Sequence, residues 1–283
     1  MADLVKGIRD DAGLRESFMA LANRVFDLSF EDWYRAGFWT DRYLPYAMVE
    51  GGRVIANASV NRISAVWNGQ PRRYIQVGTV MTDPDFRHRG LAARLIREIL
   101  RDWGDRCDGV YLYANRDAVG FYPQFGFAPG REYQYAATIQ GRAGDFRPLD
   151  VGTQLELLRR CYQQSNPYSA LCVADNFGLL MFYCGGMLRD CVYYSPSLDL
   201  VCVAERTGEE LLIYDLFGPK SCPLEEAAAR MAGPSEIRTV LGFTPLDPAG
   251  WDCAPVESED TFFLWKDTLF GAHRLMFPLL SHA

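Results

Sequence analysis

Residues 86–95 read FRHRGLAARL and place two arginines, a histidine and a glycine directly before a stretch with helical periodicity. From Leu91 to Trp103 apolar residues recur every three or four positions, which predicts an amphipathic helix that ends at Gly104. A helix N-terminus already carries partial positive charge, so arginines there are locally unfavourable. Backbone N–H groups at a helix start, combined with guanidinium groups, bind phosphate well. The stretch therefore predicts a phosphate or pyrophosphate site.

The small residues of this stretch favour the same interpretation. Gly90 lets the backbone approach a ligand, while Ala92 and Ala93 keep side-chain bulk off the first helical turn. The alternative is that Arg87 and Arg89 each pair with the aspartate four residues earlier. Such pairs explain the charges but not the glycine and the alanines, so anion binding is the better hypothesis.

The surrounding sequence predicts a mixed α/β fold. Strands are expected at 4–9, 46–50, 53–67 and 72–82, and helices at 11–26 and 30–36. Glycine-containing turns link the last three of these strands into an antiparallel meander. After the helix that starts at Leu91, we expect a strand at 109–114, a short helix at 117–124 and a closing strand at 127–138. The strand, loop, helix and strand from 72 to 114 form a βαβ unit with parallel strands.

A similar order of elements follows a glycine-containing linker at 141–144. Helices are expected at 152–164, 177–188 and 224–231, and strands at 191–194, 198–205, 210–217, 237–241 and 261–267. This order predicts two domains, 1–142 and 143–283, the second being either a degenerate copy of the first or an unrelated α+β domain. Its corresponding helix start, FGPKSCPLEE at 217–226, has no arginine, and Glu225 and Glu226 would repel a pyrophosphate. One anion site per chain is therefore expected.

Composition narrows the class of protein. The 283 residues are 49% hydrophobic, but no apolar run reaches the roughly 20 residues of a membrane helix and no secretory signal opens the chain. A cytoplasmic protein is expected. The eight cysteines form no CxxC pair and are accompanied by three histidines, so we expect reduced thiols and no metal site. Residues 143–283 carry 10 Lys and Arg against 19 Asp and Glu, which argues against nucleic-acid binding.

The spacing of the arginine-rich stretch matches no nucleotide fingerprint, since both GxxxxGK(S/T) and GxGxxG are absent. The spacing Arg87-x-x-Gly90-x-Ala92 instead resembles the (Q/R)xxGx(G/A) signature of the GNAT superfamily of acetyl-CoA-dependent N-acetyltransferases. Residues 111–127, YLYANRDAVGFYPQFGF, resemble a later motif of that superfamily. The run RHRGL also looks like the N-terminal domain of the enhanced-intracellular-survival (Eis) type of aminoglycoside acetyltransferase.

The resemblance implies a GNAT fold for the N-terminal half, in which the strands at 72–82 and 109–114 splay apart around the pantetheine arm of acetyl-CoA. Asn115 would contact the arm, and Tyr122 would protonate the departing thiolate, although Tyr122 also fits as an aromatic packed under the following turn. The backbone groups expected to bind the acetyl-pantetheine are those of Val80, Met81 and Thr82. The residues expected to cradle the pyrophosphate are Arg87, His88, Arg89, Gly90, Leu91, Ala92 and Ala93.

The expected function is transfer of an acetyl group from acetyl-CoA to a primary amine of a small molecule or peptide, by direct attack in a ternary complex. A sensor that binds acetyl-CoA without turnover is the alternative, and a scaffold of two inactive copies is a third. No general base is assigned: Glu50, Asp83 and His88 are poorly placed, and His273 and His282 fit structural roles. The identity of the acceptor and a possible homo-oligomer stay open.

Overall fold

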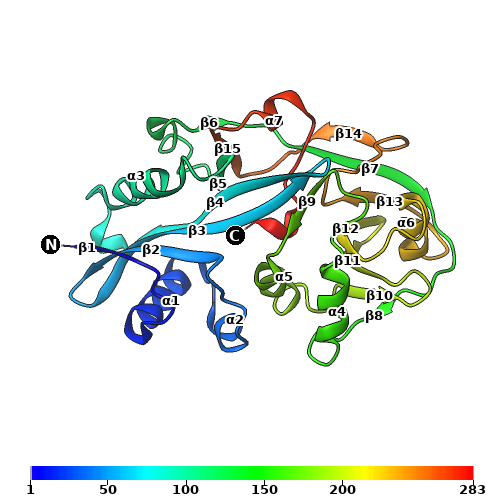
Figure 1. Cartoon of the computed structure of the whole chain (residues 1–283), viewed down its shortest axis with the longest axis horizontal. Coiled ribbons are helices and arrows are strands. Elements are labelled where there is room, and N and C mark those ends of the chain that lie inside the picture. The colour runs from blue at the N-terminus through cyan, green and yellow to red at the C-terminus, as the bar shows by residue number, and fades with distance from the viewer. Residues whose placement is uncertain (1, 283) are drawn as a thin grey trace.

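A computed structural model describes residues 2–282 as an elongated molecule with one mixed β-sheet in each half (Figure 1). The first sheet has the strand order β1-β2-β3-β4-β5-β15-β6, and β9 pairs with β3 beside this path. Its strands are β1 (Asp3–Lys6), β2 (Tyr43–Glu50), β3 (Arg53–Trp67), β4 (Gln70–Thr82), β5 (Gly109–Ala114), β6 (Ala128–Pro129), β9 (Leu171–Ala174) and β15 (Thr261–Trp265).

Helices cover both faces of the first sheet. They are α1 (Ala12–Phe26), α2 (Glu31–Arg35) and α3 (Leu91–Trp103), with α1 and α2 on one face and α3 on the other (Figure 1). Helix α1 begins after Asp11 because the carboxylate of Asp11 accepts the N–H of Leu14 at 3.0 Å, which caps the first turn. Helix α3 buries Leu95, Ile96 and Ile99 completely against the sheet, as the apolar periodicity predicts.

The second sheet has the order β14-β7-β13-β12-β11-β10-β8. Its strands are β7 (Tyr133–Gln140), β8 (Arg147–Pro148), β10 (Val192–Ser195), β11 (Leu200–Thr207), β12 (Glu210–Phe217), β13 (Glu236–Leu241) and β14 (Asp252–Pro255). The remaining helices are α4 (Leu155–Tyr162), α5 (Phe177–Cys184), α6 (Leu224–Ala232) and α7 (Leu269–Ala272). Helix α6 packs on one face of this sheet, and α4 and α5 pack on the other.

The two halves repeat one order of elements. In the first, β2, β3 and β4 are antiparallel neighbours, and α3 leads to β5, which lies parallel to β4. In the second, β10, β11 and β12 are antiparallel neighbours, and α6 leads to β13, which lies parallel to β12. The predicted fold class, a GNAT-type α/β half followed by a second α+β half, is confirmed.

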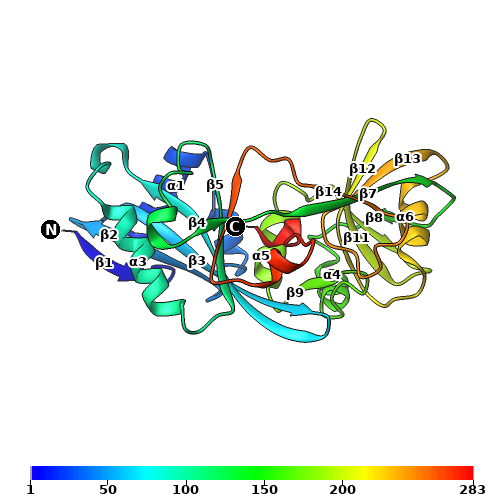
Figure 2. The ribbon, with the colours of Figure 1, turned by 90° about the horizontal axis from the view of Figure 1, so that it is seen from above.

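Three strands have partners that the sequence does not predict, and one of them is β9, which comes from the second half of the chain and pairs with β3. The closing strand expected at 127–138 is divided into β6 and β7, and β7 pairs with β13 and β14 of the second sheet. Conversely, β15 pairs with β5 and β6 of the first sheet (Figure 1). Figure 2 shows β7 beside β14 in the second half. Alternating apolar residues predict a strand but not which strand pairs with it, so the sequence does not predict these pairings. In the structure, each half completes its sheet with a strand from the other half. The domain boundary at residue 142 stays a prediction, and the chain crosses between the sheets on both sides of it.

The prediction of a short helix at 117–124 is wrong. Residues 116–121 form turns, and a single 3₁₀ turn, η2 (Pro123–Phe125), follows them. Pro123 sits at the start of this turn, and Gly126 ends it with a φ of 87°, so the segment contains both a helix breaker and a left-handed stop within four residues. Two further 3₁₀ turns are η1 (Pro84–Phe86) and η3 (Leu279–Ser281). None of the helices formed by residues 2–282 is long and apolar enough to span a membrane.

Candidate active site

The central feature of the first sheet is the divergence of β4 from β5. The two strands pair at three positions, Tyr74 with Gly109, Ile75 with Val110, and Gln76 with Tyr111. Beyond Gln76, β4 continues to Thr82 without a strand on this side among residues 2–282. The strands therefore open into a V, the geometry that the sequence resemblance implies, and unpaired backbone along β4 is left for a ligand.

A β-bulge turns the open part of β4. Asn57 lies opposite Met81 and Ser59 lies opposite Gly78, so Thr79 and Val80 together face a single residue of β3. Thr79 has a φ of 47°, in the left-handed region that a β-branched residue rarely adopts. The Asn57 amide, which is fully buried, donates to the Thr79 carbonyl at 3.0 Å and to the Ser59 hydroxyl at 2.9 Å. These bonds hold the bulge in place.

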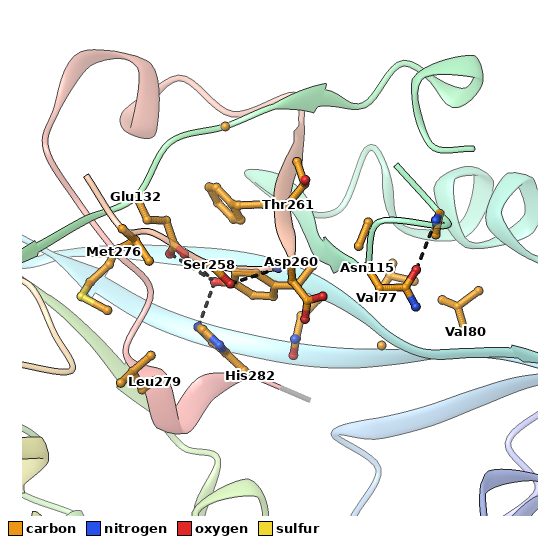
Figure 3. Close-up of a pocket in the computed structure, with 18 of the residues that line it drawn as sticks. Val77, Val80, Asn115, Glu132, Ser258, Asp260, Thr261, Met276, Leu279 and His282 are labelled. Atoms are coloured by element: carbon orange, nitrogen blue, oxygen red, sulfur yellow. Dashed lines mark hydrogen bonds between the residues drawn. The ribbon is translucent and has the colours of Figure 1, made fainter. Parts of the chain in front are cut away.

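A cavity of about 1000 Å³ lies in the open V and extends toward the second half of the chain (Figure 3). Its walls come from β4, β5, the turn after β5, the segments before β7 and β15, α5 and the C-terminal residues. Figure 3 shows Val80 and Asn115 on one side of this cavity, and Glu132, Met276 and His282 on the other. Three of the predicted site residues, Val80, Asn115 and Tyr122, line it.

The arginine-rich loop is exposed and leads into α3. His88 has a φ of 61° and Gly90 a φ of 72°, so the loop makes two left-handed turns in three residues before the helix. A non-glycine residue at positive φ is uncommon and marks a constrained loop. No side chain caps α3 at Gly90, which leaves the N–H groups of the first turn for a ligand.

Neither loop arginine forms an ion pair within residues 2–282. The Arg89 guanidinium donates to the Asp85 carbonyl at 3.1 Å and lies over the Phe86 ring, and Arg87 is exposed. The Asp83 carboxylate, which is fully buried, is instead paired with Arg24 and Arg53. The alternative of pairing with the preceding aspartates is therefore wrong, and both loop guanidinium groups stay available to an anion.

The other predicted loop and strand residues have distinct surroundings. Leu91, Ala92 and Ala93 are half-buried in the first turn of α3. The Met81 side chain is buried on the α1 face of the sheet, so Met81 presents its backbone alone to the V, and Thr82 ends the strand half-buried. The predicted roles of these residues stay predictions.

Tyr122 lies under the cavity, with 4% of its surface exposed. Its ring packs against Phe127 and Phe263, with centroid distances of 6.0 and 5.8 Å. Burial raises the pKa of the Tyr122 hydroxyl to about 12, so this group is protonated at neutral pH and has a proton to donate. Packing under the turn and acting as an acid are therefore compatible.

Asn115 closes the turn that follows β5. Its Oδ1 accepts the N–H of Ala118 at 3.1 Å, the bond drawn in Figure 3. This bond fixes the side chain at the cavity edge through its oxygen, and the amide nitrogen is the part that a ligand would meet.

Sequence reasoning missed a buried acidic group in the cavity wall. Glu132, which is 7% exposed, accepts the N–H of Phe277 at 2.8 Å, and both its oxygens lie 3.1 Å from the Tyr113 hydroxyl. The same hydroxyl lies 2.8 Å from Nε2 of His282. Burial raises the pKa of Glu132 to about 7 and lowers the pKa of His282 to about 4. A charged residue between two strands gives no sequence signal for such burial.

In the second half, the N-terminus of α6 is occupied by acidic side chains of the protein itself, as predicted. Glu226 in the first turn of α6 pairs with Arg142 at 2.7 Å and with Arg230 at 2.8 Å, and Glu225 accepts the indole N–H of Trp251 at 3.0 Å. These acidic groups complement the helix dipole at the position where α3 presents arginines. Among residues 2–282, no group of three or more His, Cys, Asp or Glu side chains could hold a metal ion.

Comparison with known proteins agrees with this geometry. Residues 14–127 match the family model described as acetyltransferase (GNAT) family. No curated protein matches the chain by sequence. The matched segment contains the splayed strands and the open helix start of the first half, so this part of the chain is similar to a GNAT acetyltransferase domain.

Solved structures extend the likeness over both halves. A probable N-acyltransferase from Enterococcus faecalis V583 is 13% identical, with a TM-score of 0.62 over 93% of this chain and 72% of that one. Eis1 from Mycobacterium abscessus is 16% identical, with a TM-score of 0.56 over 93% and 73%. A GCN5-related N-acetyltransferase from Kribbella flavida is 20% identical, with a TM-score of 0.53 over 93% and 71%. At these identities the likeness shows the fold, which is Eis-like across both halves.

Proposed function

We propose that the protein transfers the acetyl group of acetyl-CoA to a primary amine of a small molecule or peptide, by direct attack in a ternary complex. The observation that carries this proposal is the V between β4 and β5, which opens into the cavity and has the uncapped, arginine-bearing start of α3 at its side. When bound, acetyl-CoA supplies the thioester carbonyl that is attacked and the thiolate that leaves.

The chain's own residues fit this cosubstrate. The loop of residues 87–90 and the first-turn N–H groups of α3 would bind the pyrophosphate, because a helix start and two guanidinium groups offer charge-assisted hydrogen bonds. The unpaired backbone of β4 around Val80 would hold the acetyl-pantetheine and polarise the carbonyl. Asn115 would orient the arm at the edge of the cavity.

Tyr122 would serve as the proton donor for the departing thiolate. It lines the same cavity as Val80, and its hydroxyl is kept protonated by burial, which raises its pKa to about 12. Holding an amine against the carbonyl then supplies much of the rate acceleration, since no covalent intermediate on the protein is needed.

The cavity wall favours a cationic acceptor. Among residues 2–282, two carboxylates line it, Glu132 inside and Asp260 at the exposed rim. The preceding residues Glu257 and Glu259 add negative charge to the same loop, and the 143–283 half is acidic overall. An amine that is protonated in water would be attracted toward this wall.

The test is release of free CoA thiol from acetyl-CoA over a panel of polyamines, aminoglycosides, amino acids and basic peptides, with cofactor binding measured by calorimetry. We expect thiol release above buffer with at least one small cationic amine. Cofactor binding without release for any amine would favour the non-catalytic sensor, and absence of binding would reject both functions.

The loop arginines provide a direct prediction for the cofactor site. Replacing Arg87 or Arg89 with alanine should weaken acetyl-CoA binding by about 1.5–3 kcal/mol each, since each loses a hydrogen bond to a charged phosphate. This loss of binding free energy corresponds to a Kd for acetyl-CoA that is higher by about tenfold or more. Calorimetry of each variant measures the change, with Arg101→Ala in the last turn of α3 as the control of equal charge. Equal Kd values for all three variants would contradict the proposed cradle.

A further inference from the structure

Three buried polar side chains form a hydrogen-bonded row on the side of the cavity away from Val80 and Asn115, which we call the acceptor side. Glu132 comes from the connection between β6 and β7, Tyr113 from β5 and His282 from the C-terminal segment, and all three line the cavity (Figure 3). The Tyr113 hydroxyl lies between the other two, 3.1 Å from both Glu132 oxygens and 2.8 Å from Nε2 of His282. The three side chains meet although they are up to 169 positions apart in sequence.

The contacts of these three side chains define which of their groups carry a proton. The Phe277 N–H donates to Glu132 Oε1 at 2.8 Å, and the Tyr183 hydroxyl donates to the His282 carbonyl. The Tyr113 hydroxyl donates to the Glu132 carboxylate, and burial holds His282 neutral at pH 7, so the tautomer with its proton on Nε2 can donate to the tyrosine oxygen. These donors hold the Glu132 carboxylate in one orientation and partly offset the effect of burial on its pKa.

An amine acceptor needs a base that removes a proton from its ammonium form. Alkylamines are mostly protonated at neutral pH, like the lysine side chain, and the ammonium form has no lone pair for attack on a carbonyl. A base with a pKa near the working pH takes the proton most effectively. The cavity is lined by two carboxylates among the described residues, and Asp260 at the rim is exposed to water, whereas Glu132 is buried.

We propose that Glu132 is the general base of the acetyl transfer and that Tyr113 and His282 are positioning residues that orient it. The ammonium gives one proton to the Glu132 carboxylate, and its nitrogen then forms the bond to the carbonyl carbon. The carbon–sulfur bond breaks, and the thiolate takes its proton from Tyr122. The second amine proton leaves to solvent, Glu132 releases its proton to solvent, and the Tyr122 phenolate is reprotonated from solvent, so both groups are restored and the charges balance. This inference rests on the proposed function.

The other titratable groups around Glu132 do not replace it. Those nearby are Tyr111 of β5, Tyr183 of α5, Arg131 beside it in sequence, and Asp260 ahead of β15. The Tyr111 hydroxyl is fully buried and donates to the Ser281 carbonyl, and Arg131 is exposed. None of these four groups contacts Glu132 by a hydrogen bond or ion pair within residues 2–282.

The test is the pH dependence of kcat at saturating acetyl-CoA and saturating amine. For the native protein we expect kcat to rise with pH through a step near pH 7, as Glu132 loses its proton. Glu132→Gln should lower kcat about 100-fold and remove this step, since the amide cannot accept a proton at the pH of the step. Glu209→Gln, in the exposed turn between β11 and β12 and outside the cavity lining, is the matched control and should keep both rate and step.

A second variant keeps the inference testable if Glu132→Gln does not fold. Tyr113→Phe keeps the ring but removes a hydrogen bond that lowers the pKa of Glu132, so the step should move to higher pH. A step that stays in place in both variants would overturn the role of Glu132 while leaving the acetyl transfer intact. A native protein that releases no thiol with any amine would instead overturn the proposed function and this inference together.

Discussion

Replacing Tyr122 with phenylalanine should lower kcat for thiol release by about 100-fold or more, with little change in acetyl-CoA affinity. The ring stays in its packing against Phe127 and Phe263, so the variant loses the hydroxyl alone. Without a proton donor, the thiolate must leave as a free anion, which is a poorer leaving group than the neutral thiol. Steady-state kinetics with calorimetry of cofactor binding separates the two effects.

The matched control is Tyr214→Phe on β12, whose hydroxyl donates to Glu205 at 2.9 Å in the second half. It removes the same atom from a tyrosine outside the cavity lining and should leave kcat unchanged. Because the pKa of Tyr122 is raised to about 12, the native rate should show no loss from ionisation of this group up to about pH 10. Full turnover by Tyr122→Phe across this range would contradict the acid role.

Separating the halves at residue 142 should abolish folding of the N-terminal fragment. A fragment of residues 1–142 lacks β15, which pairs with five residues of β5, and it leaves β7 without its partners β13 and β14. It also loses Phe263, which is fully buried against Tyr122 in the core under α3. We expect no cooperative thermal transition by circular dichroism for the fragment, whereas the full chain should unfold cooperatively.

A point substitution isolates the same effect in the full chain. Phe263→Ala should lower the free energy of unfolding by about 3–5 kcal/mol, a large part of the roughly 5–15 kcal/mol that a domain possesses. Leu246→Ala, at a side chain that is 49% exposed, serves as the control and should change stability little. Denaturant unfolding measures both. A fragment that folds, together with a small effect of Phe263→Ala, would show that β15 is dispensable.

Local sequence patterns were sufficient for the elements around the cofactor side. The periodicity from Leu91 to Trp103 predicts α3 with its bounds, and β3 and β12 also match their predicted ranges. The loop before α3 is predicted because its unusual feature, positive charge at a positive helix end, lies within consecutive residues. Such signals do not depend on what the rest of the chain packs against.

The acceptor side could not be predicted, because its features arise from contacts between distant segments. Glu132 is buried against Phe277, which comes about 150 residues later, and against Tyr113 of β5. The exchange of β7 and β15 could not be predicted either, because a strand with alternating apolar residues fits either sheet. The segment at 117–124 misleads for another reason: its apolar residues pack as turns around Tyr122, and Pro123 prevents a regular helix.

The exchanged strands have a consequence for how the two substrates are divided within the molecule. Two of the connections that carry the chain across between the sheets, around residues 130–132 and 255–261, also wall the acceptor side of the cavity. The cosubstrate, in contrast, would be held by β4 and α3, which lie within the first half. Substitutions in the two crossings could thus retune the choice of amine while the acetyl-donor machinery stays intact.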